Sequence, residues 1–110
     1  MSLIDDNLTT VDGRLYTSVA ANSVETDEYT PPSGAELHVL KVGGDAAIDT
    51  EVKVEIKFDT EVIFSTHIAD NQTIAKQFTA DGVKKIVIRL VNDSAVTETI
   101  GGYWSGFIVE

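Results

Sequence analysis

Few side chains of this chain could do chemistry, and none of them lies in a complete catalytic motif. The 110-residue sequence has no cysteine, which excludes a thiolate nucleophile, a disulfide framework and a thiolate zinc site. His38 and His67 lie in or beside predicted strands, without the closely spaced partner that metal and general-base motifs show. Ser105 lies in the segment Gly102–Gly106, one residue off the nucleophile-elbow pattern, and no histidine follows it. We therefore expect a protein that is not an enzyme and needs no cofactor.

Three carboxylates surround one predicted loop and could bind a hard cation. Asp45, Asp49 and Glu51 offer the oxygen ligands that calcium prefers. Their spacing is not that of an EF-hand, and in a chain with 18 acidic residues such a grouping arises easily. We expect a solvated loop and no bound metal, and we keep a calcium site as the alternative.

Tyr103 and Trp104 are the candidate residues for an interface or a ligand. They are adjacent in a predicted strand, so their side chains point to opposite faces of the sheet. We expect one ring in the core and the other exposed or at a subunit contact. An exposed ring would offer a stacking platform for a sugar, and this is the place in the sequence where we would look for one.

The charge of the chain limits its partners. The formal net charge of −10 argues against nucleic acid and anionic membranes, because both require a basic face. Most of this charge falls within residues 1–50, where a basic partner surface is expected to bind. The apolar stretches are far shorter than the roughly 20 residues of a membrane helix. The first residues lack the pattern of a secretory signal, so we expect a soluble protein made in the cytoplasm.

The elements that position these residues read as strands. The clearest is Glu51–Phe58, where apolar residues alternate with charged ones and predict a sheet with one buried face. Asp59 and Thr60 then turn the chain into a hairpin partner at Glu61–Thr66. The Asp-Gly pair at residues 81–82 predicts a second hairpin that joins Thr73–Thr79 to Lys84–Asn92. Lys84–Asn92 is apolar on both faces, which is typical of a central strand.

The remaining strands are weaker and complete one domain. We expect strands over residues 14–20, 24–29, 36–42 and 97–109, the last with a bulge or bend near Gly101 and Gly102. Residues 1–13 are expected to form a polar arm, and residues 14–110 one domain. About eight short strands with turns between them predict an all-β fold, a single antiparallel, jelly-roll-like β-sandwich. A barrel is the alternative.

Three segments carry a resemblance to a known class of proteins. Residues 81–94 and 101–107 resemble the C-terminal strands of small jelly-roll modules in the structural proteins of tailed phages. The segment Tyr29–Leu37 is similar to the entry of such modules into their first core strand, which proline and glycine mark. The resemblance implies a virion or prophage component: a head decoration protein, a head fibre, or a tail-associated adaptor or receptor-binding module. It carries no functional residues to transfer.

These observations predict a non-enzymatic structural or interaction module, a homo-oligomer or part of a larger protein assembly such as a virion. The alternative is a carbohydrate- or calcium-dependent binding module that uses Trp104 or the loop from Asp45 to Glu51. A small hydrolase or isomerase is a third possibility, and it would need a cleft around His38, His67 or Ser105.

Overall fold

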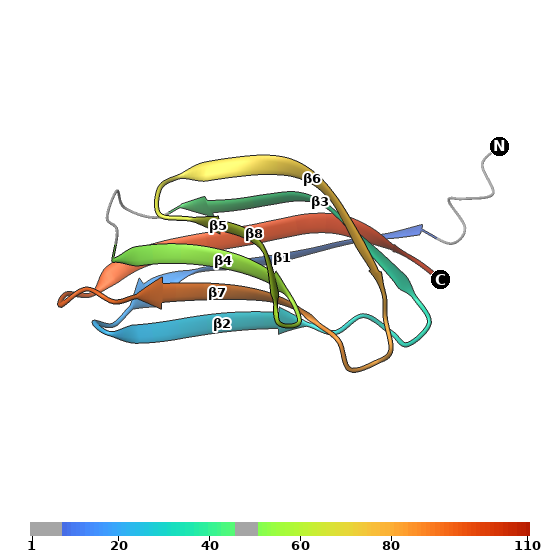
Figure 1. The fold of residues 1–110 in the computed structure, drawn as a ribbon, viewed down its shortest axis with the longest axis horizontal. Helices are drawn as coiled ribbons and strands as arrows, with labels where there is room; N and C mark the ends of the chain where they lie inside the picture. The colour runs from blue at the N-terminus through green and yellow to red at the C-terminus, as the bar shows by residue number, and fades with distance from the viewer. Residues whose placement is uncertain (1–7, 46–50) are drawn as a thin grey trace.

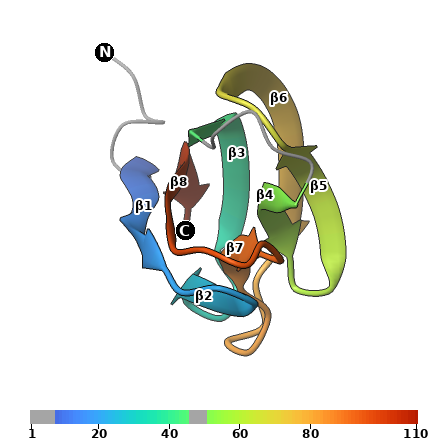
Figure 2. The same cartoon turned by 90° about the vertical axis from the view of Figure 1, so that its left-hand side faces the viewer.

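The computed structural model describes residues 8–45 and 51–110, which form eight strands in two antiparallel four-stranded sheets (Figure 1). One sheet has the order β1-β8-β3-β6 and the other β2-β7-β4-β5. The strands are β1 Leu8–Val19, β2 Ser23–Tyr29, β3 Glu36–Asp45, β4 Val52–Phe58, β5 Glu61–Thr66, β6 Asp70–Thr79, β7 Ile86–Asn92 and β8 Glu98–Val109. The sheets pack face to face (Figure 2), which confirms the predicted all-β, jelly-roll-like sandwich in place of a barrel.

The core lies between the sheets and follows the predicted alternation. In β4, Val52, Val54 and Ile56 are fully buried, whereas Lys53 and Lys57 lie on the outer face. The strand β7 lies between β2 and β4, as expected for a central strand, and its inner residues include the fully buried Ile88. Hydrophobic burial of this kind is the main stabilising term of such a fold.

The predicted hairpin between β6 and β7 is wrong. The turn itself forms: Gly82 has a φ of 82°, and Asp81 Oδ1 accepts the N–H groups of Val83 at 2.8 Å and Lys84 at 2.7 Å. However, β6 pairs with β3, while β7 pairs with β2 and β4 in the other sheet. The turn therefore carries the chain across the sandwich. An Asp-Gly pair fixes the local backbone, but it does not decide which strand the chain pairs with next.

The predicted polar arm over residues 1–13 is wrong for residues 8–13. These residues belong to β1, which pairs with β8 without interruption from Leu8 opposite Val109 to Val19 opposite Glu98. Residues 1–7 lie outside the described residues. The start of β1 looks polar in the sequence because β1 is an edge strand with one face toward solvent.

The bend expected near Gly101 and Gly102 is also wrong, because β8 keeps a regular register with β1 through both glycines. The irregularity lies in β3 instead, where its register with β6 and β8 shifts between Val39 and Lys41. Gly102 serves a close approach of the two sheets, since a Cβ atom there would lie 2.7 Å from Val54 Cγ1. The expected loop over residues 45–50 falls almost wholly outside the described residues.

Candidate functional site

The structure separates Tyr103 and Trp104 as the strand period requires. Trp104 lies in the core, 1% exposed, with its ring 5.7 Å from that of Tyr29. Its indole also fills the space that a side chain at Gly13 would need. Tyr103 lies on the outer face of the sheet β1-β8-β3-β6, where it is partly exposed. Trp104 is therefore buried away from any ligand, and Tyr103 is the member of the pair that a ligand could reach.

Aromatic rings gather on this outer face. Tyr16 on β1 lies opposite Gly101, and Tyr103 on β8 lies opposite Gly43. Each ring covers its glycine so closely that a side chain at the glycine would collide with it. Cross-strand packing of a ring on a glycine stabilises a sheet and holds the ring in place. Tyr16 remains 64% exposed, so one face of its ring is open to solvent.

The two tyrosines line a groove of about 630 Å³ at one end of this sheet. We call it the tyrosine groove and define it by six of its lining residues: Arg14, Tyr16, Asp45, Asp70, Asn71 and Tyr103. They come from β1, β3, β6 and β8, strands that are far apart in the sequence and adjacent in the sheet. The groove thus combines two aromatic rings with hydrogen-bonding side chains of both charges. Its volume is within the range of about 300–1,000 Å³ that is usual for small-ligand sites.

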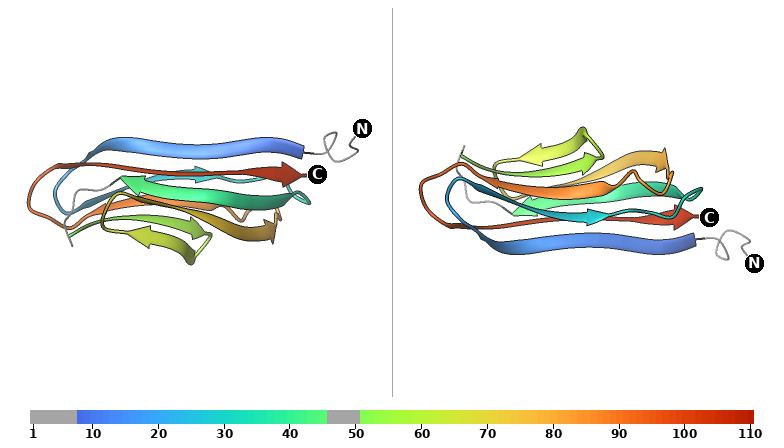
Figure 3. Two further views of the ribbon diagram at one scale, coloured as in Figure 1. Left: turned by 90° about the horizontal axis from the view of Figure 1, so that it is seen from above. Right: turned by 90° about the horizontal axis from the view of Figure 1, so that it is seen from below.

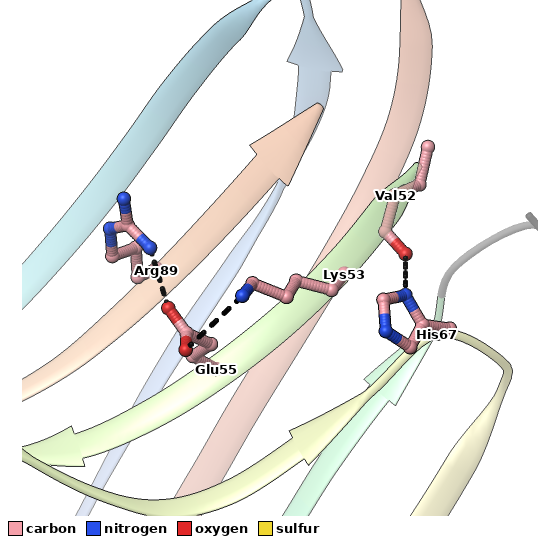
Figure 4. Close-up of polar contacts among 5 residues, drawn as sticks. All are labelled: Val52, Lys53, Glu55, His67 and Arg89. Atoms are coloured by element: carbon pink, nitrogen blue, oxygen red, sulfur yellow. Dashed lines mark hydrogen bonds and ion pairs between the residues drawn. The ribbon is translucent and has the colours of Figure 1, made fainter. Parts of the chain in front are cut away.

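Both histidines are engaged in structural contacts. His38 Nε2 donates to Glu36 Oε1 at 2.5 Å, and its imidazole stacks on Phe107 at 4.6 Å with an angle of 10° between the rings. His67 Nδ1 donates to the carbonyl oxygen of Val52 at 2.8 Å (Figure 4). Ser105 lies on the outer face of β8, opposite Lys41, and is not bonded to either histidine.

The three carboxylates of the calcium alternative are only partly described. Asp45 ends β3 and lines the tyrosine groove, and the carbonyl oxygen of Glu51 accepts the N–H of Asp93 at 2.8 Å. Asp49 lies outside the described residues, so the calcium site stays a prediction. Within residues 8–45 and 51–110, no three His, Asp or Glu side chains are grouped as a metal site requires.

The other sheet carries a charged cluster on its outer face that sequence reasoning missed. Glu55 is 8% exposed, and its Oε1 accepts from Arg89 Nη1 at 2.6 Å, while its Oε2 lies 3.7 Å from Lys53 Nζ (Figure 4). Glu55 and Arg89 are directly opposite each other on β4 and β7. The charge alternation of β4 signals the outer face, but the pair follows only from knowing that β7 is its neighbour. We assign this cluster to the stability of the sheet.

A second missed cluster lies at the end of β7. Asn92 is fully buried, and its side-chain amide bonds to three carbonyl groups and to Ser94. Among the described residues, no buried side-chain nitrogen or oxygen atom lacks a hydrogen-bond partner. Nothing in the sequence distinguishes this asparagine from those in the turns, because two of its partners, Val19 and Ala20, lie at the distant end of β1.

Comparison with known proteins shows the fold and no family. No family model and no curated protein sequence matches the chain. The Yersinia pseudotuberculosis-derived mitogen matches with 11% identity and a TM-score of 0.54, over 91% of this chain and 85% of its own. PliG of Aeromonas hydrophila, a periplasmic inhibitor of g-type lysozyme, matches with 10% identity and a TM-score of 0.51, over 87% and 85% of the two chains.

A capsid structure of the Helicobacter pylori bacteriophage KHP30 also matches, with 20% identity and a TM-score of 0.43 over 93% of both chains. The two matches with TM-scores above 0.5 show that the chain shares its β-sandwich fold with known proteins, and they assign it to no family. Residues 8–45 and 51–110 contain no helix with the length and apolarity to span a membrane.

Proposed function

We propose that this chain is a non-enzymatic interaction module that binds a neutral saccharide in the tyrosine groove. One observation carries the proposal: Tyr16 and Tyr103 lie against glycines of the neighbouring strands, beside carboxylate and amide side chains in one groove. A ring held in place loses little conformational entropy when a ligand stacks on it. Such a face is therefore prepared for a flat, partly apolar ligand.

Saccharides match both kinds of groups in the groove. The C–H face of a pyranose ring packs on an aromatic ring, and its hydroxyl groups donate to carboxylates and exchange hydrogen bonds with an amide. Tyr16 and Tyr103 supply the rings, and Asp45, Asp70 and Asn71 supply the polar groups. A neutral saccharide is favoured over a sialylated one, because the net charge of −10 repels anions.

The contacts of His38 and His67, the two histidines that could act in catalysis, support a role without catalysis. His38 is stacked on Phe107 and bonded to Glu36, and His67 is bonded to the backbone of β4. Each histidine is thus committed to a contact that holds two parts of a sheet together. The tyrosine groove lies elsewhere, and its titratable side chains do not include a histidine.

A phage or prophage virion is the biological setting that we propose, and the resemblance of residues 29–37, 81–94 and 101–107 supports it. That resemblance allows a head decoration protein, a head fibre, or a tail-associated adaptor or receptor-binding module. Among these roles, a groove for saccharides favours the receptor-binding module, because cell-surface receptors commonly present sugars.

The test is binding of the intact protein to an array of neutral and sialylated oligosaccharides, followed by calorimetric titration with the best neutral ligand. We expect neutral ligands to bind and the Tyr103→Ala variant to bind at least about tenfold more weakly, equivalent to about 1.4 kcal/mol. Phe107→Ala is the matched control, since it removes an aromatic ring from the same face of the same strand but outside the groove.

The proposal fails if no oligosaccharide on the array binds. It also fails if Phe107→Ala weakens binding as much as Tyr103→Ala, because the effect would then not belong to the groove. Asn71→Ala and Gln77→Ala repeat the comparison with two polar side chains on β6, of which Asn71 lines the groove and Gln77 does not. Thermal melting of each variant verifies that it is folded.

A further inference from the structure

The strand β1 is an edge of its sheet along its whole length. It contributes 12 residues, and its register with β8 has no shift from Leu8 to Val19. Figure 3 shows β1 at the outer margin of the molecule, with β8 beside it on one side. An edge of this kind leaves a row of backbone N–H and C=O groups free to pair with another strand.

The other three edge strands carry the features that proteins use against such pairing. The strand β2 has the exposed acids Glu25, Asp27 and Glu28 and no basic residue, so two copies of β2 repel each other. The strands β5 and β6 each have a register shift against their neighbour. A shift or bulge bends an edge away from a flat partner. Only β1, among the described edges, is long, regular and close to neutral.

We propose that β1 pairs antiparallel with β1 of a second copy of this chain, with Gly13 opposite Gly13 across a two-fold axis. In this register Asp12 of each copy lies opposite Arg14 of the other, on the outer face of the sheet. Val11 of each copy lies opposite Leu15 of the other, on the inner face. The two four-stranded sheets then join into one continuous sheet through an isologous contact.

The charges on β1 select this register over its neighbours. A slip of one residue would turn the inner side chains outward, so only slips of two keep the faces. One such slip places Asp12 opposite Asp12, and the other places Arg14 opposite Arg14. Like charges directly opposite each other destabilise an antiparallel pair. Pairing around Gly13 therefore places opposite charges opposite each other twice. It is also the register of this kind that lies nearest the middle of β1.

The side chains involved are available for this contact. Asp12 and Arg14 are exposed, and neither forms an ion pair with another residue of the described ranges. Val11 and Leu15 pack against the core but stay partly exposed at the open edge. Pairing with a second copy covers these two apolar side chains and gives each of the four charges in the contact a partner.

The test is sedimentation equilibrium of the full chain over a wide concentration range. We expect the wild type to associate to twice its monomer mass of 11.9 kDa. Asp12→Arg and Arg14→Asp each set like charges opposite each other twice and are expected to weaken the dimer at least about tenfold. The double variant, which exchanges both charges, restores opposite charges in the same register and is expected to dimerise like the wild type.

Asp27→Arg is the matched control, because it makes the same change of charge at the exposed edge β2. It is expected to leave the dimer unchanged, and melting curves verify that every variant is folded. A monomeric wild type overturns the proposal. So does a double variant that stays as weak as the single ones, or an Asp27→Arg variant that weakens the dimer equally.

This inference goes beyond the saccharide proposal and does not depend on it. Tyr103→Ala is expected to lose saccharide binding and to keep the dimer, since Tyr103 is on β8 and not on the edge. Loss of the dimer in the single charge variants and loss of binding in Tyr103→Ala are separate measurements. One proposal can therefore fail while the other stands.

Discussion

Asn92 is the side chain whose loss should destabilise this fold most for its size. Its Nδ2 donates to the carbonyl oxygens of Val19 at 3.0 Å, Ala20 at 3.3 Å and Val96 at 2.8 Å. Its Oδ1 accepts from the backbone N–H of Ser94 at 2.9 Å and from the hydroxyl of Ser94 at 2.6 Å. One amide thus ties the end of β7 to both connections beside it, from β1 to β2 and from β7 to β8.

The cost of Asn92→Ala follows from the groups that it leaves unpaired. The Val19 carbonyl and the Ser94 N–H lose their Asn92 partner in a buried setting, whereas the Ser94 hydroxyl can still donate to Val96. Each of these two unpaired buried groups costs about 1–3 kcal/mol, so we expect a loss of about 2–6 kcal/mol. That is a large part of the roughly 5–15 kcal/mol that holds a domain folded. The corresponding fall in Tm is about 8–24 °C, at about 4 °C per kcal/mol.

The assay is urea unfolding followed by the fluorescence of Trp104, the only tryptophan, which is buried in the core. The midpoint should fall while the slope stays constant, because the surface exposed on unfolding hardly changes. Asn71→Ala on the exposed face of β6 is the control and should cost less than about 0.5 kcal/mol. The reasoning is refuted if the two asparagine variants lose equal stability, or if Asn92→Ala costs less than about 1 kcal/mol.

Two further changes test the faces of β4 and the turn before β7. Ile56→Asp should unfold the domain, because it buries an unpaired charge. Lys53→Asp on the outer face should cost about 1 kcal/mol or less. Circular dichroism distinguishes a folded from an unfolded variant, and an unfolded Lys53→Asp beside a folded Ile56→Asp would mean that the two faces of β4 are exchanged. The N–H groups of Lys84 and Val83 hold the pKa of Asp81 below its ordinary 3.8, so the carboxylate stabilises the fold above that value and loses this contribution as the pH falls through the lower folded pKa. Unfolding measured from about pH 5 downward should show this dependence reduced in Asp81→Asn, and an unchanged profile would contradict the assignment.

The strands could be predicted from the sequence where burial imposes a simple period. Glu61–Thr66 forms with the predicted bounds, and β4 and β7 have the predicted faces, because alternate side chains must reach one core. Pairing between strands could not be predicted in the same way. The turn at Asp81 and Gly82 forms as expected, yet it connects two sheets, and no local signal reports that.

The candidate site shows the same division. The strand period places Tyr103 and Trp104 on opposite faces of the sheet, so the position of one of the two rings of the tyrosine groove follows from the sequence. Tyr16 and Asn71 complete the groove from β1, which is next to β8, and from β6, which is separated from β8 by β3. Only the order of the sheet brings these strands to one groove. Glycines at the positions opposite the tyrosines were the available signal, but their meaning requires the register of β1 and β3 on β8.

The misreading of residues 8–13 as a polar arm has the same physical cause as the proposed dimer. A strand that is buried on both faces can be recognised in the sequence by its run of apolar residues. An edge strand such as β1 has polar residues on its solvent face and only partly buried residues on its inner face. The start of β1 contains Asp12, Gly13 and Arg14 in a row, which looks like a turn when it is read locally. In the sheet, however, Gly13 admits the ring of Trp104, and Asp12 and Arg14 point outward together on an open edge. The features that hide this strand in the sequence are thus the ones that make it complementary to a second copy of itself.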